Sequence, residues 1–274
     1  MIDLTADCLQ VIKKRPQDSH KGTFGRAVLI GGNQQFGGAI LMSAESCVRS
    51  GCGLTTVVTD SVNHAPLHAR LPEVMTVDWN DQSLIQEVVT SADILLIGPG
   101  LGLEKRSEEL LTFIISQQTK QQRLVIDGSA ITLLAQKKWS LTYPAQTIFT
   151  PHQMEWQRLS GLRIAEQNPQ NNQLYQKKLQ ATIVLKSHRT EIYSQTACYR
   201  NPLGNPAMAT GGTGDTLAGM ITGFLAQFKK EDTTINAAVY LHSFIADHLA
   251  KENYVILPTE ISRSLPYWMK KFEN

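Results

Sequence analysis

The sequence predicts an α/β fold in which a mostly parallel sheet lies between two layers of helices, a three-layer α/β/α sandwich. Short apolar runs of strand length alternate along the chain with longer segments whose apolar residues recur at helical spacing. Several of these runs end in glycine-rich sequence, and a repeated order of strand, glycine loop and helix is typical of parallel sheets covered on both faces. Residues 1–274 contain no internal repeat, low-complexity tract or Pro/Ser linker, so we expect a single domain.

Each expected strand is rich in apolar and β-branched residues and stops at glycine, proline, aspartate or a polar turn. In chain order the expected strands are Arg26–Ile30, Leu54–Thr59, Asp93–Ile97, Leu124–Ile126, Thr147–Phe149, Thr182–Leu185 and Thr190–Tyr193. The expected helices carry apolar residues three and four positions apart. They cover Ile40–Val48, with Gly51 as a stop, then Leu110–Ile115, 213–227, 233–251 and a segment after Pro258. The Asn- and Gln-rich stretch Glu166–Gln173 is expected to be an exposed loop.

Composition excludes several classes of function. The net charge is only +2, from 26 Lys and Arg against 24 Asp and Glu, so no bulk field exists to hold nucleic acid or an anionic membrane. No segment approaches the ~20 apolar residues needed to span a bilayer, and the amino terminus lacks the features of a signal peptide. The four cysteines form no CxxC pair and are expected to be free thiols in a reducing compartment, which points to the cytoplasm. A redox role for Cys47 and Cys52 is the alternative.

The most informative segment runs from Asn201 to Asp215 and ends in Gly211-Gly212-Thr213-Gly214-Asp215, directly before a clear helix. Glycines let the backbone approach a ligand closely, and the free amides at a helix start form an anion site. This combination predicts phosphate binding together with a catalytic carboxylate, Asp215. The helix dipole favours the charged form of that carboxylate, so Asp215 is expected to be ionised and a weak base. The alternative is that Asp215 only caps the helix.

The usual nucleotide-binding motifs are absent. The pair Gly-Lys occurs nowhere, so the chain has no Walker A loop. Gly98-Pro99-Gly100-Leu101-Gly102 fails the GxGxxG pattern at its last position, as does the segment that starts at Gly212. These absences argue against a P-loop NTPase and against a Rossmann dehydrogenase.

Gly-Thr-Gly-Asp at the start of a late helix resembles the ribokinase-like superfamily, and further motifs resemble one branch of it, the ADP-dependent (S)-NAD(P)H-hydrate dehydratases. The motifs that carry the resemblance are Gly31-Gly32 with Gly37-Gly38-Ala39, Arg49 to Leu54, Pro72-Glu73-Val74-Met75, Gly98 to Gly102, Thr150-Pro151-His152-Gln153-Met154-Glu155, and Met208 to Gly219. The resemblance runs from about Lys21 to at least Gly223. The epimerase domain that many members carry needs ~200 further residues, so the chain resembles the stand-alone form.

The resemblance implies a repair enzyme for hydrated nicotinamide cofactors. A member of this family phosphorylates the hydroxyl of the hydrate (NADHX or NADPHX) with ADP, and elimination of phosphate then restores NADH or NADPH. The resemblance further implies Mg²⁺ as cofactor, ADP as co-substrate, a homotetramer, a separate epimerase as functional partner and a cytoplasmic location. It leaves the choice between NADHX and NADPHX open.

The resemblance also implies the site residues. Asp215 is the expected catalytic base and contacts the hydrate, together with Ala39, Gly102 and His152. The expected ADP-binding residues are Lys186, Ser187, His188, Arg189, Thr190, Asn205, Gly211, Gly212, Thr213 and Gly214. Glu155 is expected to organise Mg²⁺ through water. The structural alternatives are a tight turn at Gly102, a helix cap at His152, a solvated lysine at 186 and a surface glutamate at 155.

Two positions depart from the family pattern. Ser129 stands where the family usually has a second acid, and Ser187 stands where it usually has glycine. Two other functions remain open. One is an ATP-dependent kinase of a small alcohol, such as a vitamin precursor, in the same superfamily, and the other is a non-catalytic nucleotide-binding protein. Consumption of ADP to AMP that depends on the hydrate separates the dehydratase from both.

Overall fold

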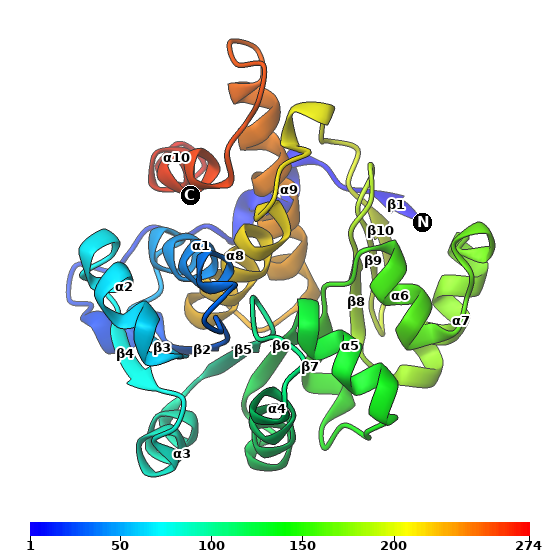
Figure 1. Ribbon diagram of the computed structural model, residues 1–274. Coiled ribbons are helices and arrows are strands. Elements are labelled where there is room, and N and C mark those ends of the chain that lie inside the picture. Colours follow the sequence, from blue (N-terminus) through cyan, green and yellow to red (C-terminus); the bar gives the residue numbers. More distant parts are fainter.

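The computed structural model describes residues 1–274 and has one sheet between two helical layers, so the predicted fold class is confirmed (Figure 1). The strands are β1 (Ile2–Asp3), β2 (Arg26–Ile30), β3 (Leu54–Thr59), β4 (Met75–Asp78), β5 (Ile94–Ile97), β6 (Arg123–Ile126), β7 (Thr147–Phe149), β8 (Thr182–Leu185), β9 (Glu191–Tyr193) and β10 (Cys198–Arg200). Their order in the sheet is β1-β10-β9-β8-β7-β6-β5-β2-β3-β4. All pairs from β4 across to β8 are parallel, and β9 runs antiparallel to both of its neighbours.

Helices cover both faces of the sheet. They are α1 (Gly37–Arg49), α2 (His64–Arg70), α3 (Gln82–Ser91), α4 (Lys105–Gln117), α5 (Gly128–Lys137), α6 (Gln153–Ser160), α7 (Pro169–Leu179), α8 (Thr213–Gln227), α9 (Asp232–Leu249) and α10 (Pro258–Lys271). In Figure 1, α1, α8, α9 and α10 lie on one face, and α3, α4 and α5 lie on the other. No helix is both long and apolar enough to span a membrane, and the four cysteines are unpaired.

The strands are apolar on both faces because each face packs against helices. In β2, Ala27 and Leu29 join the core beneath α1 and α8, whereas Val28 and Ile30 join the core beneath α4 and α5. Successive side chains of a strand point to opposite faces, so a strand covered on both sides is a continuous apolar run. This is why the bounds of β2, β3, β7 and β8 agree with the runs seen in the sequence.

The expectation of an exposed loop at Glu166–Gln173 is wrong, because α7 begins at Pro169 within that stretch. The Asn168 side chain accepts from the amide of Asn171 and caps the helix, and proline is favoured in the first helical turn. Asn172 is buried, and its Oδ1 accepts from Trp156 Nε1 at 2.8 Å. The polar side chain therefore faces inward because it satisfies a buried donor.

The connectivity of the sheet fixes where a ligand can bind. From β2 the chain moves outward through β3 and β4, and from β5 it moves in the other direction through β6, β7 and β8. Ligands of such sheets bind outside the carboxyl ends of the strands, near the point where the direction reverses. The segments at that edge are Gly31-Gly32 after β2, Gly98–Gly102 after β5, Asp127 after β6, Thr150–His152 after β7 and Lys186 after β8.

Candidate active site

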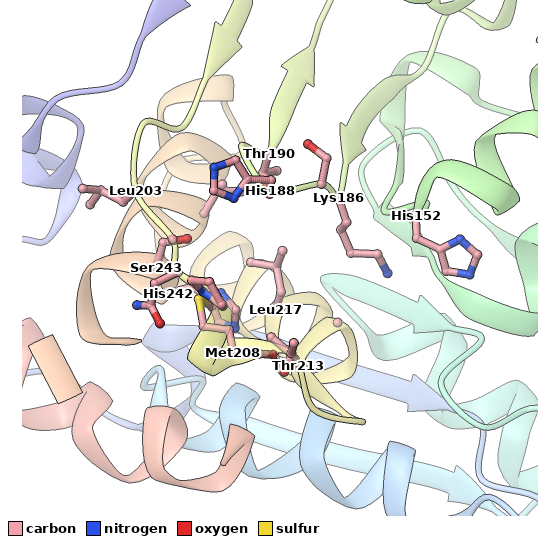
Figure 2. Close-up of a pocket in the computed structure, with 17 residues that line it drawn as sticks. His152, Lys186, His188, Thr190, Leu203, Met208, Thr213, Leu217, His242 and Ser243 are labelled. Carbon is pink, nitrogen blue, oxygen red and sulfur yellow. Dashed lines mark hydrogen bonds between the residues drawn. The ribbon is translucent and has the colours of Figure 1, made fainter. Parts of the chain in front are cut away.

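A cavity of about 480 Å³ opens at this edge of the sheet, between the end of β8, the loop before α8 and the helix α9 (Figure 2). One wall is polar and carries Lys186 and the residues that follow it. The floor is apolar and includes Leu203, Met208, Leu217 and Val239. A cavity of this size with an apolar floor and a few convergent polar groups is typical of a small-molecule site.

The amino end of α8 forms one side of this cavity. Gly212 adopts a φ of +96°, a left-handed conformation that favours glycine, and no side chain caps the helix. The backbone amides from Gly211 to Gly214 have no acceptor within the chain. Thr213 instead directs its hydroxyl away from the helix start, to the carbonyls of Met208 at 2.9 Å and Thr210 at 3.1 Å. The free amides and the helix dipole together form a site for an anion.

Asp215 lies in the first turn of α8, and its environment differs from the expectation. We expected the helix dipole to keep this carboxylate a weak base. Burial instead raises its pKa to about 6, and the charge of Asp127 raises the pKa further, while Lys186 opposes both effects. The dipole effect is outweighed because the side chain lies largely away from solvent. The cap of α8 is the backbone of Gly212, so Asp215 is not the capping residue.

The ammonium of Lys186 lies between Asp127 and the amino end of α8. Its Nζ donates to Asp127 Oδ1 at 2.7 Å, and only 19% of its side chain is exposed. A Cβ built on Gly214 would lie 3.0 Å from this Nζ, so the ammonium stands against the amino end of α8. Burial by itself would lower the pKa of Lys186, but the carboxylates of Asp127, Glu155 and Asp215 outweigh burial and raise it. The alternative of a solvated lysine therefore does not describe this side chain.

His152 and Glu155 form a reciprocal cap at the start of α6. The Nδ1 of His152 accepts from the amides of Met154 and Glu155, and Glu155 Oε2 accepts from the amide of His152 at 2.8 Å. The imidazole is half-exposed and lines the cavity, and burial followed by the charge of Lys186 lowers its pKa. Glu155 is buried rather than a surface residue, and burial raises its pKa to about 7.

Neither Ala39 nor Gly102 lines this cavity: Ala39 lies in the first turn of α1, and Gly102 ends the loop that follows β5. The loop from Gly98 to Gly102 packs on the start of α1, since a Cβ on Gly100 would lie 3.1 Å from the Cβ of Ala39. Gly102 has a φ of +82° and donates its amide to Ser129 Oγ at 3.3 Å. The turn is therefore tight, and Ser129, one of the two departures from the family pattern, supports it directly.

The structure brings together most of the residues predicted for the nucleotide. Those that line the cavity are Lys186, Ser187, His188, Thr190, Asn205, Thr213 and Gly214. Gly211 and Gly212 lie just outside the lining, in the loop that leads into α8. Arg189 also lies outside it and donates to the carbonyl of Gly204 at 2.8 Å, so it supports the loop from behind.

Reasoning from the sequence missed some residues of the site. Asp127 was not among the expected site residues, although a carboxylate directly after a strand end is a signal for this edge of the sheet. His242 and Ser243 line the cavity from α9. His242 is buried, and burial lowers its pKa to about 4. Neither residue carries a local motif, so no sequence signal pointed to them.

Comparisons with known proteins agree with this arrangement. The family model described as NAD(P)H-hydrate dehydratase matches residues 27–267. The ADP-dependent (S)-NAD(P)H-hydrate dehydratase of Enterococcus faecalis is 60% identical over 270 residues, which cover 98% of this chain and 93% of that protein.

Two solved structures extend the comparison. A ribokinase-like superfamily protein from Enterococcus faecalis has a TM-score of 0.98 at 59% identity, over 100% of this chain and 96% of that one. The ADP/ATP-dependent NAD(P)H-hydrate dehydratase of Bacillus subtilis, co-crystallised with ATP/Mg²⁺, has a TM-score of 0.87 at 29% identity, over 99% of both chains. With this sheet order, this anion site and these relatives, the chain belongs to the NAD(P)H-hydrate dehydratase family and has the ribokinase-like fold.

Proposed function

We propose that the protein is an ADP-dependent (S)-NAD(P)H-hydrate dehydratase, a lyase that repairs hydrated nicotinamide cofactors. The observation that carries this proposal is that three features lie together at the amino end of α8, beside a nucleotide-sized cavity that Lys186, Thr213 and Gly214 line. These features are the free amides of Gly211 to Gly214, the carboxylate of Asp215 and the ammonium of Lys186. A related kinase would share them, but family membership along nearly the whole chain favours the dehydratase.

The reaction balances in two steps. In the first, the hydroxyl oxygen of the hydrate attacks the β-phosphorus of ADP, the bond from that phosphorus to the bridging oxygen breaks, AMP leaves, and the hydroxyl proton passes to a base. In the second, the carbon–oxygen bond breaks, phosphate departs with its electron pair, and the ring loses a proton to become NADH or NADPH. Hydroxide is a poor leaving group, and the first step replaces it with phosphate.

Asp215 suits the role of the base. Phosphoryl transfer needs a group that orients the attacking hydroxyl and takes its proton. The carboxylate stands at the helix end that holds the anion, so acceptor and donor meet there. Burial raises its pKa to about 6, which makes it a stronger base than an exposed aspartate while it remains mostly ionised at pH 7.

Lys186 and the amino end of α8 would hold the transferring phosphoryl group. Negative charge spreads over its oxygens during transfer, and fixed donors aimed at this charge lower the barrier. The amides of Gly211 to Gly214 are such donors because the chain leaves them unpaired. The Lys186 ammonium adds a full positive charge a few ångströms away.

The rest of the nucleotide fits the remainder of the cavity. The apolar floor suits a purine ring, and the polar groups of Thr190, Asn205 and Ser243 stand around it. The loop that carries Asn205 is fixed by Asp247, which accepts from the Asn205 side chain at 2.6 Å and from the amide of Gly204 at 3.1 Å. Ser187 lines the cavity at an exposed position, and its hydroxyl donates to the carbonyl of Arg189 at 2.7 Å.

The hydrate would bind toward the reversal point of the sheet. Ala39 lies in the first turn of α1, and Gly102 ends the loop that follows β5. The strand β7, which leads into His152, lies between β5 and β8 in the sheet order. The Nδ1 of His152 accepts from the amides of the helix cap, and Nε2 lies 3.4 Å from Glu155 Oε1, so a ligand would share Nε2 with that carboxylate. The nicotinamide end of the substrate is the expected partner.

The residues present fit a Mg²⁺ ion carried by the nucleotide rather than a metal held by the protein alone. No three His, Cys, Asp or Glu side chains are grouped to hold a metal. Mg²⁺ in phosphoryl-transfer sites usually keeps several waters and takes one or two carboxylates with substrate phosphates. Glu155 is a buried carboxylate with a raised pKa beside the cavity, so a cation nearby would be favourable to it. When bound, Mg²⁺ would neutralise phosphate charge.

We further propose that the chain acts as one domain, since a single sheet joins strands from β1 to β10. By the resemblance, the protein would work as a cytoplasmic homotetramer beside a separate epimerase that supplies the S form of the hydrate.

The decisive experiment measures recovery of reduced-nicotinamide absorbance from chemically prepared hydrate with ADP and Mg²⁺. AMP and phosphate should form in equal amounts with the reduced cofactor. Omission of ADP is the control. Phosphorylation of a vitamin-precursor alcohol by ATP, without dehydration of the hydrate, would instead establish the kinase.

A further inference from the structure

Asp127 is a buried carboxylate that is hydrogen-bonded to one side chain of the candidate active site, Lys186. It follows β6 directly, and 3% of its side chain is exposed. Its Oδ1 accepts from Thr150 Oγ1 at 2.6 Å and from Lys186 Nζ at 2.7 Å. Asp127 does not line the cavity, whereas Lys186 does. Through hydrogen bonds, Asp127 can therefore act on a bound phosphate by way of Lys186.

The ammonium of Lys186 has donors to spare. A lysine carries three N–H donors, and Asp127 is the one acceptor that the chain provides for this Nζ. The other two donors are left for a ligand. The nearby position of Gly214 places them at the amino end of α8, beside the unpaired amides that form the anion site.

Several carboxylates compete for this single cation. Asp215 faces it from α8 and Glu155 from α6, in addition to Asp127. The charges that face Asp215 are Asp127 from the end of β6 and Lys186 from the end of β8. The helix α1 contributes only an uncharged contact, from the Ser43 hydroxyl to the backbone carbonyl of Asp215. If Lys186 closed onto Asp215, it would neutralise the base and leave the phosphoryl position.

We propose that Asp127 is a positioning residue that holds the Lys186 ammonium over the amino end of α8, where it meets the transferred phosphoryl group and stays off Asp215. This inference rests on the proposed function for its kinetic consequences, but its effect on nucleotide binding does not depend on the hydrate. The two carboxylates thus have different roles: Asp127 orients the Lys186 ammonium, and Asp215 takes the proton.

A double-mutant cycle tests whether Asp127 acts through Lys186. The variants are Asp127→Asn, Lys186→Met and the double variant, and the measurements are kcat and the dissociation constant of ADP. Lys186→Met should lower kcat by ~10²-fold, as expected for loss of a charged phosphoryl contact. Asp127→Asn should lower kcat at least tenfold and raise the dissociation constant of ADP. In the double variant the Asp127→Asn change should cost nothing further, because its target is gone.

The pH profile provides a readout that a purely structural role would not move. In the parent, kcat/KM should fall as the pH drops through about 6, because Asp215 becomes protonated. Asp127→Asn removes a repelling charge and frees Lys186 to pair with Asp215, so this acid limb should move down by ~1 pH unit. Thr150→Val is the matched control, since it removes the other hydrogen bond to the same oxygen without a change in charge. Its acid limb should stay in place.

Three results would overturn the proposal. In the first, Asp127→Asn keeps the kcat and the acid limb of the parent. In the second, the kcat of the double variant falls by the product of the two single losses. In the third, Asp127→Asn tightens ADP binding by the same factor whether or not Lys186 is present. The last result would mean that Asp127 merely repels phosphate. If Asp127→Asn does not fold, the smaller Asp127→Ser replaces it in the cycle. If the parent shows no turnover of hydrate, the proposed function fails, while the ADP cycle still decides the role of Asp127.

Discussion

Replacement of Asp215 by asparagine should abolish turnover and at the same time stabilise the fold. Asparagine keeps the size of the side chain but has neither the charge nor the proton affinity. Loss of a general base typically costs ~10²–10⁴-fold in rate. The stabilisation follows from the raised pKa of Asp215, because the ionised form of a half-buried carboxylate with a raised pKa is less favourable in the folded state than in the unfolded chain.

The magnitude follows from the two pKa values. The pKa of Asp215 rises from 3.8 to about 6 on folding. At ~1.4 kcal/mol for each pKa unit, and with allowance for partial exposure, the ionised carboxylate costs the fold about 2–3 kcal/mol at pH 7.5. This cost is present above the folded pKa, decreases between pH 6 and 4, and vanishes below the unfolded value. The melting temperature of Asp215→Asn should therefore exceed that of the parent by roughly 4–10 °C at pH 7.5, and by nothing near pH 3.5.

The assay combines thermal unfolding at both pH values, steady-state turnover and an ADP titration. Asp18→Asn is the matched control, since it removes one charge at an exposed position far from the cavity in sequence. ADP should bind to Asp215→Asn at least as tightly as to the parent, because one charge that repels the phosphates is gone. A lower melting temperature with retained activity would refute the reasoning and make Asp215 a structural residue. Activity within a few-fold of the parent would by itself exclude Asp215 as the base.

Three further predictions concern the ligands and the fold. ADP or ATP at 100 times its dissociation constant should add roughly 2.7 kcal/mol to the free energy of unfolding, and NAD⁺ should add less; a melting temperature unmoved by adenine nucleotide would contradict the anion site. His152→Asn, which keeps an acceptor for the cap of α6, and Gly102→Ala should raise KM for the hydrate more than KM for ADP, as steady-state kinetics would show; a change in ADP alone would reverse the division of the site. Asn172→Ala should lower the free energy of unfolding by about 1–3 kcal/mol, because it leaves the indole N–H of Trp156 buried and unpaired, while turnover per folded molecule stays unchanged. Denaturant unfolding measures the last effect, and an unchanged midpoint would contradict it.

The sequence predicted the strands that are buried on both faces. Strands such as β2 and β8 are apolar on both faces, so their runs stand out without knowledge of their neighbours. The strand β4 and the helix α3 were not predicted, because they lie near the edge of the molecule and mix exposed polar residues with the buried ones. A half-exposed element gives a weaker pattern than a buried one.

The misassigned helix α7 has a different cause. Its start carries the expected signal, an Asn168 cap followed by Pro169, but the asparagines and glutamines after it were taken as a sign of exposure. Asn172 and Gln176 are buried because their partners are buried polar groups: the Trp156 indole for the first, the Ala181 carbonyl for the second. Trp156 lies on a different helix, so composition alone could not show that these side chains point inward.

In the site, too, local motifs were predictable from the sequence, whereas effects of distant residues were not. Motifs placed the loop before α8 and Lys186, and the structure brings them to one cavity. The electrostatics could not be predicted, because they depend on strand ends that are distant in sequence. Asp127 and Asp215 are separated by much of the chain, yet the first raises the pKa of the second. A local argument from the helix dipole therefore missed the rise in the pKa of Asp215, although the carboxylate stays mostly ionised at pH 7 as expected.

The raised pKa of Asp215 bears on the proposed catalysis. A shift in pKa from 3.8 to about 6 makes Asp215 ~10²-fold more basic, yet about nine-tenths of the molecules keep it ionised at pH 7. A further rise in this pKa would make Asp215 more basic but leave fewer molecules with the carboxylate ionised. A pKa lowered by the helix dipole alone would leave Asp215 a weak base. Burial and Asp127 raise the pKa of Asp215, and Lys186 limits the rise. The end of β6, the end of β8 and the start of α8 thus together set the proton affinity of Asp215 close to neutral pH. Under the proposed function, the arrangement that costs the fold stability is thus the one that suits proton transfer to Asp215.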